Sequence, residues 1–232
     1  MSETIQPPVG NPAPGTLFAT RVLIQNIERQ KDPERCAEIV HHLIEAEVVI
    51  MRRQSKSESS AFVAGSMQRR VDKQMRERDE RDPDGTADVT CRRGCTACCY
   101  QNVSVSEPEA DLAYKQAFLA GHELDVERLR KQAQHGVETY QSALTHAERR
   151  CVMLKDDGDC AIYHARPNAC RVYRVVSDPE QCDTEKHPHG GTLSLTTPLA
   201  EVVITAAMRA FRYGSFAALL LECIEGEPTP CP

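Results

Sequence analysis

Eight of the eleven cysteines in this 232-residue chain fall into two blocks about fifty residues apart. The first block places four thiols within nine residues. The second is looser and spreads over about thirty. The two blocks consist of Cys91, Cys95, Cys98 and Cys99, and of Cys151, Cys160, Cys170 and Cys182. A chain of this length can bury a hydrophobic core large enough to fold without disulfide bonds. Thiols at this density therefore indicate metal or redox chemistry rather than structural disulfides.

The spacing within the first block suits metal ligation. Gaps of three and two residues let a turning backbone point several sulfurs at one centre, and Gly94 permits the positive φ or close approach that such a turn needs. Cys98 and Cys99 differ from the others because they are adjacent. Side chains of neighbouring residues diverge in most backbone conformations, so this pair is expected to serve two centres, or one centre and a packing role.

The second block contains two local signals that gather its cysteines. The turn sequence at residues 156–158 is expected to bring Cys151 and Cys160 together. Pro167 marks a helix start just before Cys170, where free backbone N–H groups are able to donate to thiolates. Positive charge to offset the thiolates is offered by Arg166 and Arg171.

The order of these residues resembles the YkgJ-type cysteine cluster proteins, a family with a zinc- or iron-chelating CxxCC domain. The matching positions are the eight cysteines together with Ile162, Tyr163, Arg166, Pro167 and Arg171, and they span residues 91–182. The resemblance implies that zinc or iron, as an ion or as an iron–sulfur cluster, is bound by Cys91, Cys95, Cys98, Cys99, Cys151, Cys160, Cys170 and Cys182. A similar domain occurs in flagellin lysine methylases, but this sequence shows no glycine-rich nucleotide loop.

The other cysteines and the nearby histidines have simpler interpretations. Cys36 and Cys223 lie on apolar helix faces, where a buried thiol is favoured, and Cys231 is an unpaired thiol in a proline-rich tail. His164 is a candidate for an outer position around the metal. The pair His187 and His189 offers a further nitrogen ligand, although a surface loop is favoured for it.

Hydrophobic periodicity predicts a mainly α-helical fold around the cysteine-rich region, with short strand or hairpin segments. One expected helix carries an apolar stripe of Ile39, Leu43, Ala46 and Ile50. Ser106 and Glu109 form a capping-box pattern at another helix start. Helices are expected at 17–27, 33–53, 55–81, 107–121, 125–148 and 198–221, and strands at 102–105, 172–176 and 192–196.

These elements divide the chain into five expected parts. They are a disordered tail at 1–16, N-terminal helices at 17–81, the cysteine-cluster region at 85–185, a C-terminal helix at 192–225 that packs on the same domain, and a tail at 226–232.

Charge and hydropathy narrow the choice of partners. A formal net charge of −6 and a pI near 5.8 argue against general nucleic-acid binding. Charged residues interrupt the longest apolar stretch, so we expect no membrane span, and the N-terminus lacks a secretory pattern, so we expect a cytoplasmic protein. The favoured function is metal binding, with no catalytic residue assigned. A redox or protein-modifying enzyme and a structural zinc module for protein interaction are the alternatives.

Overall fold

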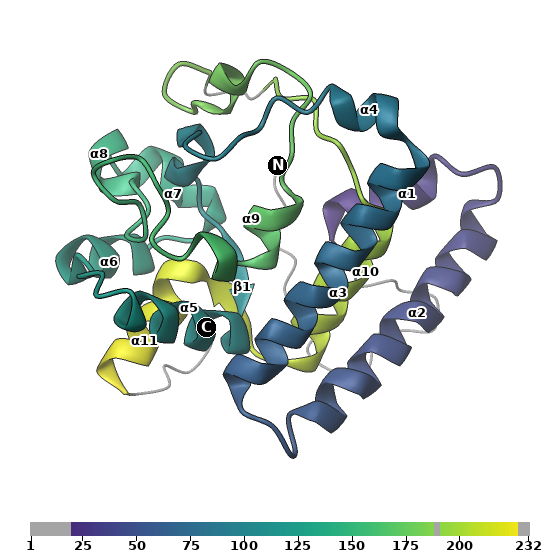
Figure 1. The fold of residues 1–232 in the computed structure, drawn as a ribbon, viewed down its shortest axis with the longest axis horizontal. Helices are drawn as coiled ribbons and strands as arrows, with labels where there is room; N and C mark the ends of the chain where they lie inside the picture. Colours follow the sequence, from purple (N-terminus) through teal and green to yellow (C-terminus); the bar gives the residue numbers. More distant parts are fainter. Residues whose placement is uncertain (1–19, 188–190, 227–232) are drawn as a thin grey trace.

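The computed structural model describes residues 20–187 and 191–226. The tail at 1–16, Cys231 and His189 lie outside this range. Within it the fold is mainly helical, which confirms the predicted class (Figure 1). The α-helices are α1 Arg21–Glu28, α2 Pro33–Gln54, α3 Ser60–Arg81, α4 Pro83–Ala87, α5 Glu107–Leu119, α6 Val126–Ala133, α7 Val137–Ala143, α8 His146–Arg149, α9 Asn168–Val172, α10 Pro198–Ala210 and α11 Phe216–Glu225. Three 3-10 turns, η1 Ala97–Tyr100, η2 Tyr163–Ala165 and η3 Pro179–Cys182, and two strands, β1 Ser104–Ser106 and β2 Tyr213–Ser215, complete the described fold.

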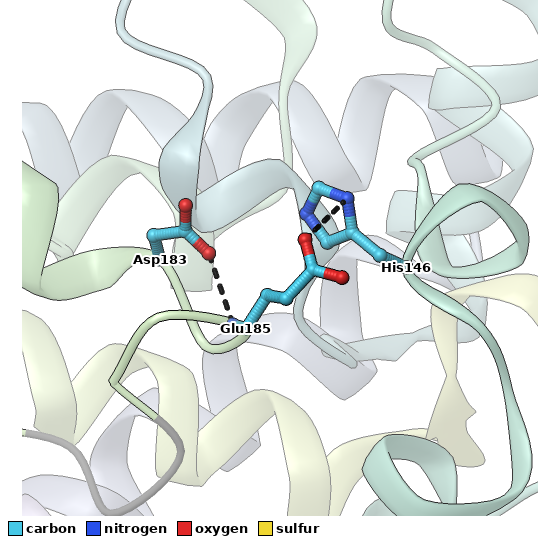
Figure 2. Close-up of side chains that lie close together, drawn as sticks. All are labelled: His146, Asp183 and Glu185. Atoms are coloured by element: carbon cyan, nitrogen blue, oxygen red, sulfur yellow. Dashed lines mark hydrogen bonds and ion pairs between the residues drawn. The ribbon is translucent and has the colours of Figure 1, made fainter.

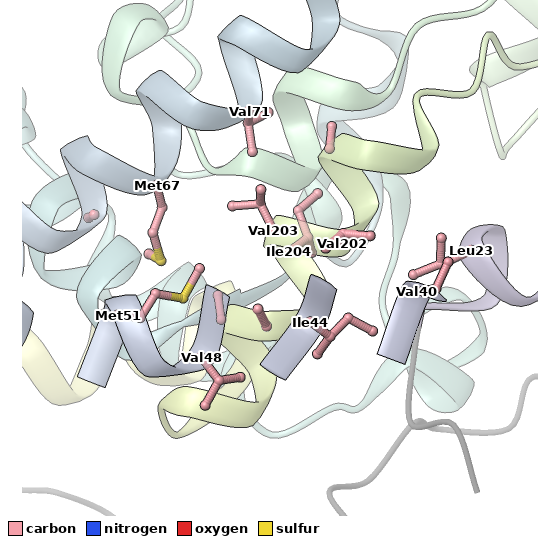
Figure 3. Close-up of a cluster of buried hydrophobic side chains, with 14 of the residues drawn as sticks. Leu23, Val40, Ile44, Val48, Met51, Met67, Val71, Val202, Val203 and Ile204 are labelled. Carbon is pink, nitrogen blue, oxygen red and sulfur yellow. The ribbon is translucent and has the colours of Figure 1, made fainter. Parts of the chain in front are cut away.

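A first hydrophobic core is built where α10 packs against α1, α2 and α3 (Figure 3). Its fully buried side chains include Ile44 and Met51 from α2 and Met67 and Val71 from α3. Burying side chains of this size stabilises the fold by about 1.5–3 kcal/mol each. This core fixes the position of α3. Helix α3 in turn packs against α9, which belongs to the cysteine region.

A second core lies beside the cysteine region. It joins α5, α6 and α11 to the segment that follows Cys151, with Leu129, Met153 and Leu220 almost fully buried. The two strands lie at its edge and pair antiparallel, with Val105 opposite Gly214. Residues from the C-terminal part of the chain are therefore packed directly against the cysteine-bearing segments.

The predicted apolar stripe of α2 does not form the core. Ile39, Leu43, Ala46 and Ile50 are all exposed, whereas a neighbouring stripe of Val40, Ile44, Val48 and Met51 is buried. The helix is apolar on both stripes, and α10 covers only the second. Periodicity located the helix correctly but selected the stripe that the core does not use.

Two long helices expected from the sequence are interrupted. The segment predicted as one helix at 125–148 forms α6, α7 and α8, and the last of these begins at a capping box of Thr145 and Glu148. The segment at 198–221 is broken by β2, after which the Ser215 side chain caps α11 by accepting from Ala218 N–H at 3.1 Å. Local capping by hydroxyl side chains outweighed the continuous helical pattern in both places.

The expected strands were found in part. The segment at 102–105 overlaps β1, and the segments at 172–176 and 192–196 meet through an antiparallel bridge between Val175 and Ser194. β2 was not predicted. No helix among the described residues is both long enough and apolar enough to cross a membrane.

Candidate metal centre

The first cysteine block forms a tight loop followed by a 3-10 turn. Cys95 N–H donates to the Arg92 carbonyl at 3.1 Å, and Gly94 between them adopts a φ of 85°, as expected for a turn that needs glycine. Cys98 and Cys99 both lie on η1. The block therefore presents its four thiols from one short, sharply turning segment.

The second block begins with the predicted reversal of the chain. Leu154 and Cys160 form an antiparallel bridge, and Gly158 in the turn adopts a φ of 85°. Cys151 and Cys160 thus lie on adjacent segments. Each thiol also interacts with the backbone N–H two residues further on, from Met153 and Ile162 respectively, and this interaction favours the thiolate.

Cys170 is carried by α9, whose first residue is Asn168. The N–H of Asn168 does not point to a sulfur but donates to the Glu109 carboxylate at 2.8 Å. Glu109 is only 5% exposed, and its other oxygen accepts from the N–H and hydroxyl of Ser106 at 3.0 and 2.7 Å. The predicted capping box is confirmed, and it also anchors the helix that bears Cys170.

Seven of the eight cysteines line one cavity of about 310 Å³. They are Cys91, Cys95, Cys98, Cys99, Cys151, Cys160 and Cys170. The eighth, Cys182, is buried at the end of η3 with its sulfur 4.0 Å from the Tyr173 hydroxyl, and Tyr173 itself lines the cavity. Cysteines far apart in sequence thus line one cavity. Cys182 does not line it but contacts Tyr173, which does.

Hydrogen bonds to backbone groups join the two cysteine blocks. Cys151 N–H donates to the Cys99 carbonyl at 2.8 Å, and Val175 N–H donates to the Cys91 sulfur at 3.2 Å. The Gln101 side chain reaches the Cys182 carbonyl at 3.2 Å. The seven cysteines lining the cavity form no disulfide in the described part of the chain.

The thiols lie in unequal electrostatic environments. Burial raises the pKa of Cys151 to about 11 and raises the pKa of Cys170 further above its usual value. A hydrogen bond from Cys99 lowers the pKa of Cys98 to about 7 and raises the pKa of Cys99. Both residues of this adjacent pair line the same cavity.

The two arginines expected to offset thiolate charge have different roles. Arg166 faces the cavity, where burial raises the pKa of Cys160 and Cys170 and the arginine's charge offsets part of that rise; the same charge adds to the lowering of the Cys98 pKa. Arg171 also touches the cavity, but its guanidinium donates to both carboxylate oxygens of Asp72 on α3 at 3.1 Å. The first arginine balances the sulfurs, and the second fixes the region to the helical core.

The distances between the cysteine sulfurs differ from those of a single metal site. Sulfurs bound to a single tetrahedral zinc lie about 3.8 Å apart, given a Zn–S length of about 2.3 Å. Across residues 20–187 and 191–226, no three cysteine sulfurs lie within 4.8 Å of one another. The cysteine sulfurs are therefore spaced more widely than the ligands of a single zinc ion.

A group of three potential ligands that the sequence analysis missed lies near the cysteine region (Figure 2). The ligand atoms of His146, Asp183 and Glu185 lie within 4.8 Å of one another. His146 Nδ1 is 3.4 Å from a Glu185 carboxylate oxygen, and its ring stacks on Tyr100 with centroids 4.1 Å apart. Their sequence positions gave no signal, because His146 is separated from the other two by about forty residues.

The remaining sequence candidates lie away from the cavity. Cys36 is half-buried against the first core, and Cys223 is half-buried against the second. His164 is exposed, and its carbonyl accepts from Arg171. His187 is also exposed, so none of these four residues lines the cavity.

This arrangement defines a cysteine-cluster domain, and a comparison with known families gives its class. Residues 90–189 match the CxxCxxCC family, described as a putative zinc- or iron-chelating domain. The match covers 100 of the 232 residues and includes all eight cysteines of the two blocks. These residues therefore belong to the cysteine-cluster family that the sequence resembles. No curated protein and no solved structure matches the chain.

Proposed function

We propose that this protein binds zinc or iron through the cysteine thiolates of the central cavity. The observation that carries the proposal is the convergence of seven cysteines, from positions 91 to 170, on one cavity. Thiolates are the side chains that select zinc and iron–sulfur clusters in proteins. The proposed ligands are Cys91, Cys95, Cys98, Cys99, Cys151, Cys160, Cys170 and Cys182.

The surroundings of the sulfurs support thiolate ligation. Four thiolates around a divalent ion leave a net charge of −2, and positive groups are needed to balance it. Arg166 and the backbone N–H groups of Val175, Met153 and Ile162 supply this balance. A bound metal would contribute its binding free energy to folding, because the ligands come from segments that only the folded chain brings together.

The lining of the cavity is chemically suited to binding a thiophilic metal. Its described residues include cysteines, apolar side chains, tyrosines and arginines, but no Asp, Glu or His. Asp159, which precedes Cys160 in the chain, is paired with Arg93 at 2.8 Å. The family's description as zinc- or iron-chelating agrees with this interpretation.

The experiment is the metal content of full-length protein purified without added metal under anaerobic conditions, read beside its visible absorption spectrum. We expect at least one zinc or iron per chain. A colourless zinc protein indicates zinc thiolate ligation, and absorption near 400 nm with labile sulfide indicates an iron–sulfur cluster. Protein that is fully reduced and metal-free, and that does not take up either metal on titration, would contradict the proposal.

Matched cysteine variants then test the ligand assignment. Cys170→Ala removes a thiol that lines the cavity, and Cys36→Ala removes a half-buried thiol that packs on the first core instead. We expect Cys170→Ala to lower bound metal per chain and Cys36→Ala to leave it unchanged. Metal loss in Cys36→Ala with none in Cys170→Ala would place the site elsewhere.

A further inference from the structure

Four arginines of the described chain line the cysteine cavity, but only one of them is both partly buried and without an ion pair. Arg171 and Arg174 each pair with an aspartate of α3, at 3.1 and 2.7 Å. Arg92 is exposed. Arg166 is partly buried, and none of the ion pairs in the described part of the chain includes it. Arg166 therefore offers the sulfurs a charge that neither a carboxylate nor full exposure to solvent weakens.

The backbone of Arg166 is fixed, and its guanidinium lies against an aromatic ring. Its carbonyl accepts from Gln68 Nε2 at 3.2 Å and from Arg171 Nε at 3.0 Å. Pro167 restricts the preceding residue to extended conformations, and Arg166 has a ψ of 148°. The buried Nε of Arg166 has no hydrogen-bond partner among the described residues. Its guanidinium carbon lies 4.1 Å from the centre of the Tyr163 ring, which is within cation–π distance.

Tyr163 is itself held close to both cysteine blocks. It begins η2, three residues after Cys160, and it also lines the cavity. A second arginine, Arg93 of the first cysteine loop, lies 5.3 Å from the same ring centre and pairs with Asp159 at 2.8 Å. The Tyr163 ring thus contacts one arginine from each cysteine block.

We propose that Tyr163 is a positioning residue that holds the Arg166 guanidinium at the cysteine cavity, where its charge stabilises the thiolates in their metal-bound form. This inference rests on the proposed metal binding. The ring fixes the direction of the side chain, and the cation acts on the sulfurs. Without the ring, the arginine side chain regains its rotamer freedom, and its charge is screened whenever it turns into water.

The electrostatics of the sulfurs agree with this assignment. Burial raises the pKa of Cys160 and Cys170, and the charge of Arg166 opposes that rise. Metal ligation requires the deprotonated thiols. A cation that is held beside the sulfurs therefore favours the state of the cysteines that binds metal.

The affinity of reduced, metal-free, full-length protein for Zn²⁺, measured by competition with a chromophoric chelator, tests the effect of each residue. We expect Arg166→Gln to weaken binding by about 10- to 100-fold and Tyr163→Leu by roughly tenfold. Tyr163→Phe retains the ring and should stay within about twofold of the wild type. Arg92→Gln is the matched control, because it removes the same charge from an exposed position, and we expect a change below about threefold.

A double-mutant cycle separates positioning from a merely structural role. If the ring acts through the guanidinium, Tyr163→Leu should cause no further loss of affinity in the Arg166→Gln background. The same loss in both backgrounds would overturn the proposal, and so would unchanged affinity in Tyr163→Leu alone. Wild-type protein that takes up neither Zn²⁺ nor iron would contradict the proposed function, and this inference with it.

A variant that preserves the shape of the ring covers the case in which Tyr163→Leu does not fold. Pentafluorophenylalanine at position 163 has nearly the shape of Phe but reverses the ring quadrupole, so it repels the guanidinium. We expect it to bind Zn²⁺ at least about fivefold more weakly than Tyr163→Phe. Equal affinity in these two variants would show that the ring does not act by holding a cation, which would overturn the proposal.

Discussion

The carboxylate of Glu109 accepts a hydrogen bond of 2.8 Å from the backbone N–H of Asn168, 59 residues further along the chain. One buried side chain therefore caps its own helix, α5, and anchors the first residue of α9, which carries Cys170. Cysteine ligands need precise placement, and groups that hold a ligand in place typically change metal affinity 10- to 100-fold when removed. Glu109 connects the helical insert between the two cysteine blocks to the proposed ligand set.

Replacing Glu109 with Gln should weaken both its contact with Ser106 and its contact with Asn168. The neutral amide loses charge-assisted hydrogen bonds to Ser106 and Asn168, at a cost of about 1–3 kcal/mol in unfolding free energy. We also expect a weaker affinity for metal, measured by competition with a chromophoric chelator. The control is Glu123→Gln at an exposed position. Equal stability and affinity in the two variants would show that the Glu109 connection is dispensable.

Removing two arginines near the cysteine region should have very different effects. Arg171 is 8% exposed and donates to Asp72, Gln68 and the Arg166 carbonyl. Arg171→Met removes the donor to Asp72 and to the Gln68 side-chain oxygen, whereas the Arg166 carbonyl still accepts from Gln68 Nε2, so we expect a loss of at least about 2 kcal/mol.

Arg93 is the comparison, because it forms a mainly exposed ion pair with Asp159. Arg93→Met should cost less than about 1 kcal/mol. Urea denaturation of both variants gives the comparison, and similar losses would show that burial of the Arg171 network contributes little.

Glu201 should make stability fall as the pH rises. Burial raises the pKa of this carboxyl group on α10, partly offset by a hydrogen bond with Thr20. Because the folded pKa lies above the unfolded one, the folded state binds the proton more tightly. This contribution is complete below the unfolded pKa, near 4.3, and is lost as the pH rises through the folded pKa.

Glu201→Gln removes this penalty and should stabilise the protein at pH 7 by about 0.5–2 kcal/mol, with little difference from the wild type near pH 4. Exposed Glu28→Gln on α1 serves as the control. Thermal unfolding between pH 4 and 8 measures the effect. A gain that is the same at both ends of the range would argue against titration of Glu201.

Metal uptake by the apo protein should release protons. Burial raises the pKa of the Cys151 and Cys170 thiols, so both are protonated at pH 7 in the absence of metal, and ligation requires the thiolates. Affinity should therefore increase between pH 6 and 8. Calorimetric titration with Zn²⁺ in two buffers of different ionisation enthalpy counts the released protons, and equal heats in both buffers would exclude coupled deprotonation.

The cysteine set was visible in the sequence because ligand chemistry depends on residue type and order. Seven of those eight residues do meet at one cavity. The capping box of Ser106 and Glu109 was also visible, because it is a local pattern. The hydrogen bond from Asn168 N–H to Glu109 could not be predicted, because no local sequence pattern links positions 109 and 168.

The misassigned parts share a physical cause. The wrong stripe on α2 and the unpredicted strand β2 were both decided by packing between distant segments. Periodicity alone does not say which of two apolar stripes α10 will cover, and β2 has only three residues, whose place is fixed by pairing with β1. The sequence therefore indicates local elements and the proposed ligand residues, whereas tertiary contacts decide how the local elements pack.

The pairing of β1 with β2 has a consequence for the order of events during synthesis. Phe216 N–H donates to the Val103 carbonyl at 2.7 Å, and Phe216 and Ala217 form part of the cavity wall. A nascent chain that has emerged only as far as Cys182 already contains both cysteine blocks but lacks that wall and its supporting strand. Assembly of the complete cavity must therefore wait until residue 217 has left the ribosome, so the thiols that emerge earlier stay accessible to other reactants until then.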